Sequence, residues 1–349
     1  MAKQWGDSPS ASSTSATIGI LDIPDDAVVI AVMGLTGAGK SYFIQQATGL
    51  DTGASSSLKS ATQKVTPYLL LAGDRKIVIL DSPGFDDSER SDAVILQMIA
   101  SWMTYLYKSG KALVGIIYVQ DMLSVRVGRS SRMSMKMFQE MCGVGCLRNV
   151  ILLLNKCALV PAEVVRSREK EYREDFWSFM IANGSSVEKF EKDTNALQIV
   201  LSMCYNKPIV TNLALELVEL GINLSETSAG KVVCENIEDT RKETQNEMSR
   251  TKNELQDAIR NGKQETQRTL EKERRDYDTH LNRLATEQRQ FKTWRLPPIE
   301  QVVAGLKTAG IVVITVGVLA LKVAVIGLKV ANVVNGDVSG IRSLLSGGN

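Results

Sequence analysis

The sequence predicts an α/β fold, with a mainly parallel central sheet flanked by helices, followed by a long helical arm and an apolar C-terminal helix. Apolar runs rich in β-branched residues alternate with amphipathic segments, which favours a parallel sheet with crossover helices. A densely charged region with apolar residues at heptad spacing comes next. The predicted parts are a disordered tail (1–26), an α/β domain (27–235), a charged helical or coiled-coil arm (236–296) and the C-terminal helix and tail (297–349).

A glycine-rich loop follows the first predicted strand, Ala27–Met33. Residues Gly34–Ser41 (GLTGAGKS) match the G-x-x-x-x-G-K-[ST] pattern of a phosphate-binding loop, ahead of a predicted helix over Ser41–Ala47. The glycines allow a tight turn that points backbone N–H groups at phosphates, and Lys40 supplies a positive charge for the β- and γ-phosphates. The residues expected to contact the nucleotide here are Gly34, Thr36, Gly37, Ala38, Gly39, Lys40, Ser41 and Tyr42.

Three side chains are expected to bind Mg²⁺. Ser41 supplies a hydroxyl, Asp81 supplies a carboxylate at the end of an apolar run, and Thr62 lies in a polar loop where a nucleotide-sensing switch would close. Thr66 is the alternative to Thr62. The Asp-x-x-Gly spacing from Asp81 brings the backbone N–H of Gly84 to the γ-phosphate. The catalytic set predicted from these motifs is Lys40, Thr62 and Gly84.

Further apolar runs predict the rest of the sheet. The first two are separated by a short turn and form a hairpin. The predicted strands are Val65–Leu71, Arg75–Leu80, Leu113–Val119 and Asn149–Leu154. Ligands bind beyond the carboxyl ends of such strands, so Asn155 and Lys156, which follow the last of them, are expected to join the phosphate loop in the nucleotide site.

Composition excludes several classes of protein. A net charge of +2 over 349 residues argues against electrostatic binding of nucleic acid. The single histidine, His280, excludes a multi-histidine metal site and a Ser-His-Asp triad. The 5 scattered cysteines indicate free thiols in a reducing compartment, and no secretory signal is expected. We therefore expect a cytoplasmic protein, either free or held peripherally or by an anchor on an intracellular membrane.

The charged region has an interrupted heptad pattern that changes phase near Gly262. Its apolar positions are Met248, Leu255, Leu270, Tyr277, Leu281, Leu284 and Phe291. One interpretation is a coiled-coil arm that pairs two chains or folds back on itself. The other is a long solvated helix, since many seam positions are polar.

After Pro297-Pro298 comes a strongly apolar stretch, 302–334, interrupted by Lys307, Lys322 and Lys329. Within it, Ala309–Leu328 carries one charge, Lys322, and is long enough to cross a bilayer. The three lysines fall on one side of a helical wheel, a pattern that also suits a helix lying in the membrane interface. Packing against protein is the third interpretation.

Together these motifs resemble the septin-like (paraseptin) P-loop GTPases. The closest likeness is to fungal G-domain-containing proteins related to immunity-associated GTPases. The residues that carry it are GLTGAGKS at 34–41, SAT at 60–62, DSPGF at 81–85, GIIYVQD at 115–121, NVILLLNK at 149–156 and the ETSAG that closes Glu216–Gly230. The resemblance implies a domain that binds GTP or GDP with Mg²⁺ and forms homo-oligomers across the nucleotide face.

Two positions depart from the GTPase pattern. The guanine-binding loop usually carries Asn/Thr-Lys-x-Asp, but Ala158 replaces the final acid here, so a preference for GTP over ATP is supported by the resemblance alone. Phe85 replaces the glutamine that orients water in many GTPases. We therefore predict a GTP-binding switch with slow hydrolysis. The alternative is a nucleotide-gated structural or membrane-assembly protein with negligible hydrolysis.

Overall fold

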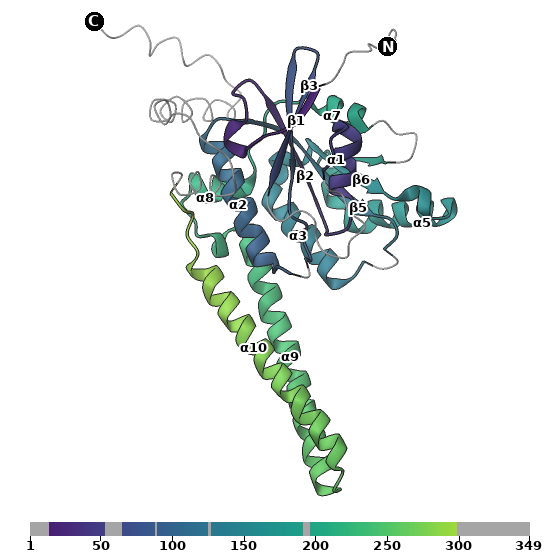
Figure 1. Ribbon diagram of the computed structural model, residues 1–349, viewed down its shortest axis with the longest axis vertical. Coiled ribbons are helices and arrows are strands. Elements are labelled where there is room, and N and C mark those ends of the chain that lie inside the picture. Colours follow the sequence, from purple (N-terminus) through teal and green to yellow (C-terminus); the bar gives the residue numbers. More distant parts are fainter. Residues whose placement is uncertain (1–13, 53–64, 88, 125–126, 191–195, 299–349) are drawn as a thin grey trace, which may run out of the picture.

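The computed structural model describes residues 14–52, 65–87, 89–124, 127–190 and 196–298. These residues form a sheet domain from which two long helices project side by side (Figure 1). The predicted magnesium ligand Thr62 and residues 299–349 of the predicted C-terminal helix and tail lie outside the described residues.

The mainly parallel sheet predicted from the sequence is confirmed, with strands in the order β1-β3-β4-β2-β5-β6-β7. The strands are β1 (Thr14–Thr17), β2 (Val28–Gly34), β3 (Thr66–Ala72), β4 (Arg75–Asp81), β5 (Ala112–Asp121), β6 (Val150–Asn155) and β7 (Ser186–Lys189). Parallel pairs join β2 to β4 and β5, β5 to β6, and β6 to β7, whereas β3 is antiparallel to β1 and β4. The parallel register places Asp81 beside Val32 and Asp121 beside Asn155. These residues lie at the carboxyl ends of the parallel strands.

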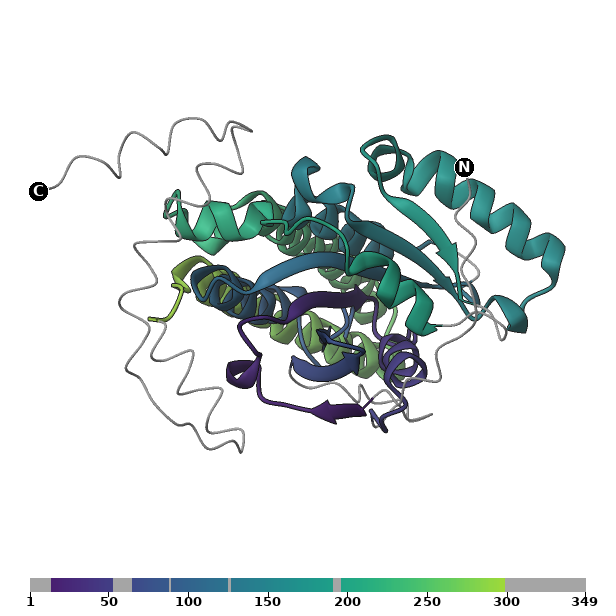
Figure 2. The same cartoon turned by 90° about the horizontal axis from the view of Figure 1, so that it is seen from above.

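Helices cover both faces of the sheet (Figure 2). They are α1 (Lys40–Thr48), α2 (Asp92–Lys108), α3 (Arg129–Cys142), α4 (Val144–Leu147), α5 (Ala162–Glu171), α6 (Ser178–Ala182), α7 (Ala196–Met203), α8 (Asn212–Val218), α9 (Ser228–Arg260) and α10 (Gln264–Thr293). Residues in β2 alternate between two cores: Val29 joins the cluster beneath α2, α3 and α9, and Ile30 joins the cluster beneath α1 and α7.

The helical segment from Ala162 to Ala182 is interrupted. A π-helical turn, Tyr172–Phe176, separates α5 from α6, and the Trp177 N–H donates to the Tyr172 carbonyl at 2.7 Å. Trp177 is fully buried and its ring centroid lies 4.7 Å from that of Tyr172. The wider turn directs this large ring into the core, which a regular helical period does not anticipate.

Part of the predicted disordered tail belongs to the fold. β1 pairs antiparallel with β3 at the edge of the sheet, from Thr14 opposite Leu71 onward. Ile20 and Ile23 follow it and are buried against the core. The average composition of residues 1–26 is polar, and it conceals these few apolar side chains, whose burial depends on a strand far away in the sequence.

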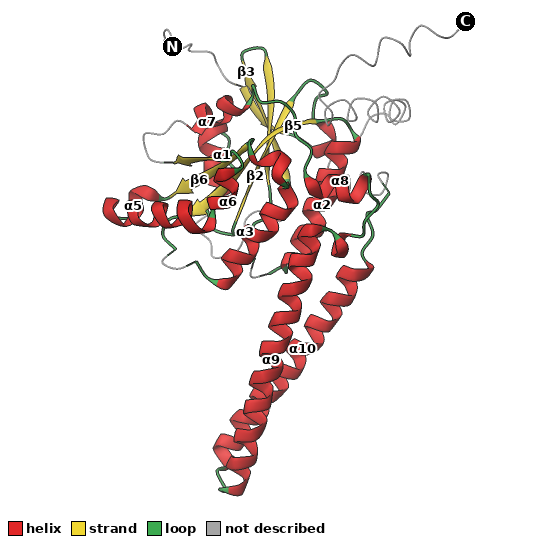
Figure 3. Ribbon diagram, turned by 180° about the vertical axis from the view of Figure 1, so that it is seen from behind, coloured by secondary structure: helices red, strands yellow, loops and turns green. Residues whose placement is uncertain are grey.

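The charged arm folds back on itself within one chain (Figure 3). Helices α9 and α10 pack along each other, and the chain reverses at Gly262, whose φ of 67° is in the left-handed region that favours glycine. This is one of the alternatives that the interrupted heptads left open. The described part of the chain contains no helix with the length and apolarity needed to cross a membrane.

The ETSAG segment fixes the start of the arm. Thr227 caps α9, since its Oγ1 accepts a hydrogen bond from Gly230 N at 3.0 Å. The Glu216 carboxylate of α8 accepts from the backbone N–H and the hydroxyl of Ser228, at 3.0 and 2.7 Å. A Cβ at Gly230 would lie 1.7 Å from the Leu224 carbonyl oxygen, so only glycine fits there. These contacts hold the first turn of α9 against the sheet domain.

Candidate functional site: the phosphate loop and its surroundings

The predicted phosphate loop lies between the end of β2 and the first turn of α1. Gly34, Gly37 and Gly39 have φ values of 138°, 76° and 94°, which other residues rarely adopt. A Cβ at Gly34 would meet the Val119 carbonyl oxygen of β5 at 2.3 Å, whereas a Cβ at Gly37 would meet nothing within 4 Å. The loop is therefore packed against the sheet at its base and open at Gly37. This shape suits a cradle for an anion at a helix N-terminus.

Lys40 is buried inside this loop. Its Nζ donates to the Leu35 carbonyl at 2.9 Å and to the Gly34 carbonyl at 3.3 Å, and among the described residues it forms no ion pair. Burial lowers the pKa of Lys40 to about 8, against the opposing effects of the Asp81 and Asp87 carboxylates. A buried ammonium without an ionic partner is unfavourable unless an anion binds beside it. Its position fits a phosphate ligand.

Ser41 and Asp81 lie next to each other, as the motifs predicted. The Ser41 hydroxyl donates to Asp81 Oδ2 at 2.6 Å, although the residues are 40 positions apart. A hydroxyl and a carboxylate in contact at the end of a parallel strand are ligands that suit Mg²⁺. The described residues thus bring together two of the three predicted magnesium ligands.

Gly84 lies against the phosphate loop. A Cβ at this position would lie 2.5 Å from both the backbone nitrogen and the hydroxyl oxygen of Thr36. The neighbouring backbone is hydrogen-bonded to the loop in both directions. Thr36 N donates to the Phe85 carbonyl at 2.8 Å, and Phe85 N donates to the Gly34 carbonyl at 3.2 Å.

Asn155 and Lys156 reach the same loop from the end of β6. Asn155 Nδ2 donates to the Ala38 carbonyl at 2.8 Å, and Lys156 Nζ donates to the Gly37 carbonyl at 2.8 Å. Lys156 has a left-handed φ of 63°, which turns its side chain back over the loop. Its ammonium also lies 2.6 Å from Asp121 Oδ2 at the end of β5. The predicted base-binding end and the phosphate loop therefore form one connected site.

One predicted contact, Tyr42, and the position of the missing acid, Ala158, differ from the residues above. The Tyr42 side chain is half exposed on α1, and its ring centroid lies 6.0 Å from that of Phe190. Ala158 is exposed in a short 3-10 helix (Cys157–Leu159) and offers no carboxylate for guanine.

Sequence reasoning missed two acids at this site. Asp121 pairs with Lys156, and Asp87 accepts a hydrogen bond from the Thr36 hydroxyl at 3.4 Å. Asp121 had a detectable signal, because it ends a buried strand that runs beside β6 in the parallel sheet. Asp87 had none, because its position depends on how the loop after Gly84 turns.

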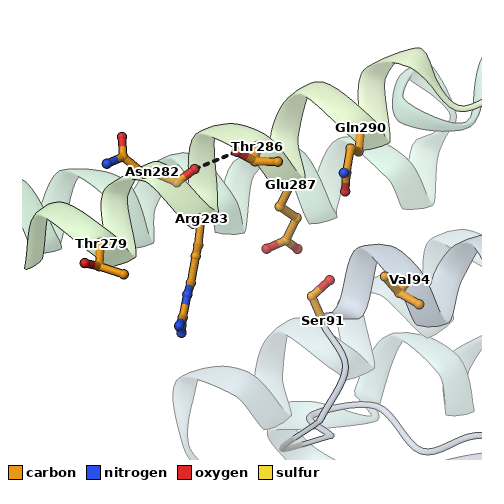
Figure 4. Close-up of a pocket in the computed structure, with 8 residues that line it drawn as sticks. All are labelled: Ser91, Val94, Thr279, Asn282, Arg283, Thr286, Glu287 and Gln290. Atoms are coloured by element: carbon orange, nitrogen blue, oxygen red, sulfur yellow. Dashed lines mark hydrogen bonds between the residues drawn. The ribbon is translucent and has the colours of Figure 1, made fainter. Parts of the chain in front are cut away.

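A shallow cavity lies beside the arm, away from these phosphate-loop residues (Figure 4). Ser91 and Val94 at the start of α2 face Arg283, Glu287 and neighbouring residues of α10 across it. Burial raises the pKa of Asp92, also in the first turn of α2, and the nearby carboxylates of Asp86 and Glu287 add to the rise. This region connects the loop after Asp81 to the arm.

The fold and this site have the features of a P-loop nucleotide-binding domain. Residues 29–156 match the family model described as 50S ribosome-binding GTPase. The matched range begins in β2, contains the phosphate loop and the Asp81–Gly84 segment, and ends at Lys156. No curated protein matches the chain significantly.

The solved structures that match part of the chain include three nucleotide complexes. Toc33 from Arabidopsis thaliana with Mg²⁺ and GMPPNP is 13% identical, with 52% of this chain and 87% of that chain covered and a TM-score of 0.41. Toc33 with GDP and Mg²⁺ is 14% identical, with 53% and 88% covered and a TM-score of 0.39. A variant of Era from Aquifex aeolicus bound to GDP and AlF4⁻ is 17% identical, with 52% and 58% covered and a TM-score of 0.37.

Proposed function

We propose that the protein is a GTP-binding switch with slow Mg²⁺-dependent GTP hydrolysis, regulated by nucleotide-dependent homo-oligomerisation. The observation that carries the proposal is the buried Lys40 ammonium, held by two phosphate-loop carbonyls and paired with no acid among the described residues. The adjacent Ser41–Asp81 pair fits a metal at the same end of the site. A nucleoside triphosphate with Mg²⁺ would place negative phosphates beside Lys40 and a cation beside the Ser41–Asp81 pair.

Lys40 and the backbone N–H groups of the loop would bind the phosphates and stabilise charge as the γ-phosphoryl group leaves. Asn155 and Lys156 would hold the loop in position from the base side. When bound, Mg²⁺ supplies further neutralisation of the phosphate oxygens. Hydrolysis is proposed to be slow because Phe85, in place of a water-orienting glutamine, is fully buried in the core.

The same burial of Phe85 favours a second candidate, a nucleotide-gated assembly protein that binds GTP and hydrolyses almost none. The GIIYVQD and ETSAG motifs support placing either candidate among septin-like, immunity-associated GTPases. Phosphate release measured at low and high protein concentration separates the two. A rate of phosphate release per protein molecule that rises with protein concentration supports the switch. No release at any protein concentration supports the assembly protein.

The test of nucleotide binding is Lys40→Ala. We expect the GTP affinity to fall by about a hundredfold or more, because one buried positive charge on the phosphates is lost. The matched control is Lys252→Ala, at an exposed position of α9, which should bind as the wild type does. Equal affinity in Lys40→Ala and the wild type, by titration with a fluorescent GTP analogue, would contradict the proposal.

Guanine preference is proposed from the resemblance and the family match. Ala158 cannot accept from the guanine N1 and N2 groups, so discrimination against ATP should be weak, below roughly a thousandfold. Competition binding with GTP and ATP measures it. A larger preference would mean that another residue contacts guanine.

We also propose that the protein works in the cytoplasm, in keeping with its free cysteines: Cys142, Cys146, Cys157, Cys204 and Cys234. Membrane association through the predicted C-terminal helix and tail, 297–349, stays a prediction. Liposome flotation of the full chain and of a chain lacking residues 300–349 tests it. Loss of flotation on truncation is expected, and full-length protein that ignores liposomes would contradict it.

A further inference from the structure

The loop after Gly84 places Asp87 next to the phosphate loop. The Thr36 hydroxyl donates to Asp87 Oδ2 at 3.4 Å, although 51 positions separate the two residues. The other carboxylate oxygen, Oδ1, accepts from the backbone nitrogen of Glu89 at 2.8 Å. The carboxylate is thus oriented from two sides, with one oxygen directed at the phosphate loop.

Backbone contacts explain why Asp87 lies there. Phe85 is hydrogen-bonded to the loop through both its N–H and its carbonyl. Asp86 then adopts a left-handed φ of 56°, and its N–H donates to Asp92 Oδ1 at 3.1 Å. This turn reverses the chain immediately before Asp87. The position of the carboxylate is therefore set by the main chain.

The surroundings locate Asp87 at the γ-phosphate end. Thr36 contacts Gly84, whose N–H is expected to face the γ-phosphate. Asp87 is also one of the two carboxylates whose charge acts on Lys40. The other, Asp81, is hydrogen-bonded to Ser41 and belongs to the metal side. Asp87 therefore contacts the phosphate loop through Thr36 and stands apart from the Ser41–Asp81 pair.

The mechanism needs such a group. Phe85 follows Gly84 where many GTPases carry the glutamine that orients water, and its side chain is fully buried in the core. We propose that Asp87 is the catalytic residue that orients and deprotonates the attacking water, an inference that rests on the proposed GTP hydrolysis. An Asp in this role is a general base, which typically contributes 10²–10⁴-fold.

In this step the water oxygen forms a bond to the γ-phosphorus while the bond from that phosphorus to the β–γ bridging oxygen breaks. The electron pair of the broken bond stays on the terminal oxygen of GDP. The water proton passes to the Asp87 carboxylate and then to the released phosphate or to solvent. The Thr36 hydroxyl, which donates a hydrogen bond to Asp87 in the structure, would keep the carboxylate facing the water.

The test is Asp87→Asn in the full chain, which keeps the shape of the side chain and the acceptor oxygen but removes the base. Single-turnover GTP hydrolysis should slow by about a hundredfold, whereas the affinity for a non-hydrolysable GTP analogue should change less than about threefold. The matched control is Asp74→Asn, in the exposed turn between β3 and β4, which should hydrolyse at the wild-type rate.

Other outcomes separate the two proposals. If the wild type fails to bind GTP, the proposed function itself is overturned. If it binds and hydrolyses GTP and Asp87→Asn retains the rate, only the role of Asp87 is overturned. If Asp87→Asn hydrolyses GTP at the wild-type rate and binds GTP more tightly, the Asp87 carboxylate repels the γ-phosphate and does not act on the water. That result also overturns the catalytic role. A wild type that binds GTP without hydrolysis overturns the catalytic role as well.

Discussion

The sheet domain and the arm bury their side chains in different ways. In the domain, aromatic and branched side chains such as Phe43, Tyr118 and Trp177 are fully buried in two cores, one on each face of the sheet. At the far end of the arm, the buried cluster consists of Leu255, Ala258 and Leu270. The domain is therefore stabilised mainly by dense apolar packing, and the distal arm by a thin seam that can open locally.

Charge is also distributed differently. Lys40 in the domain is a buried cation held by backbone carbonyls. The arm meets α3 through exposed pairs, in which Arg129 contacts Asp239 and Glu243. Buried charges respond to pH and to ligands, whereas exposed pairs respond to salt. Mutations, pH and salt should therefore affect the two regions separately.

The largest expected effect is in the domain core. Phe43→Ala removes a ring that lies 5.3 Å from Phe190 in an edge-to-face contact, and it should lower the free energy of unfolding by about 3–5 kcal/mol. Urea unfolding measures it. The control is Tyr42→Ala, its half-exposed neighbour, which should have a much smaller effect. Similar losses in both variants would contradict the packing argument.

A smaller effect is expected at the tip of the arm. Leu255→Ala should destabilise the local structure by about 2 kcal/mol, the low end for such changes, because the cluster is small and solvent is near. Hydrogen exchange should speed up around Gly262, while the unfolding midpoint of the domain stays almost unchanged. A large fall in that midpoint would mean that the arm and the domain unfold as one unit.

The comparison also shows which parts of the structure the sequence could predict. The phosphate loop and the Ser41–Asp81 pair follow from local motifs and from the rule that parallel strands end at one edge. Gly262 was visible as a change of phase, but heptads alone could not decide between pairing two chains and folding back. β1 and β7 were missed because short, polar strands form only where a neighbour is available. Asp87 was missed because its position depends on the left-handed turn at Asp86.

The pH dependence of nucleotide binding tests the buried cation. In the free protein the pKa of Lys40 is about 8, below the ordinary 10.5, and bound phosphates should raise it again. Below pH 8 the side chain is already protonated, so affinity is insensitive to this group. Above pH 8 binding must take up a proton, and affinity should fall by up to about tenfold, or 1.4 kcal/mol, per pH unit.

Calorimetric titration with GTP in buffers of different ionisation enthalpy measures both the affinity and the proton uptake. The pH dependence of the free energy of unfolding should have the opposite sign to that of GTP affinity. The unfolded chain holds this proton more tightly, so between pH 8 and 10.5 the contribution of Lys40 to the free energy of unfolding should rise with pH. Lys40→Met should remove both trends. An affinity that stays constant from pH 7 to 9.5 in the wild type would mean either that the pKa of Lys40 is not lowered in the free protein or that Lys40 does not contact the phosphates.

The smallest effect is expected where the arm meets α3. Arg129 contacts Glu243, and its guanidinium also lies 3.3 Å from Asp239, but all three side chains are more than a third exposed. Water and salt therefore screen the attraction, and a double-mutant cycle of Arg129→Gln and Glu243→Gln should give a coupling of about 0.5 kcal/mol at low salt. The coupling should vanish at about 1 M salt, where the Debye length is near 3 Å. The α8–α9 joint at Glu216 and Ser228 should keep the arm attached in these variants. A coupling well above 1 kcal/mol that resists salt would show that these pairs, and not the joint and the apolar contacts, determine the position of the arm.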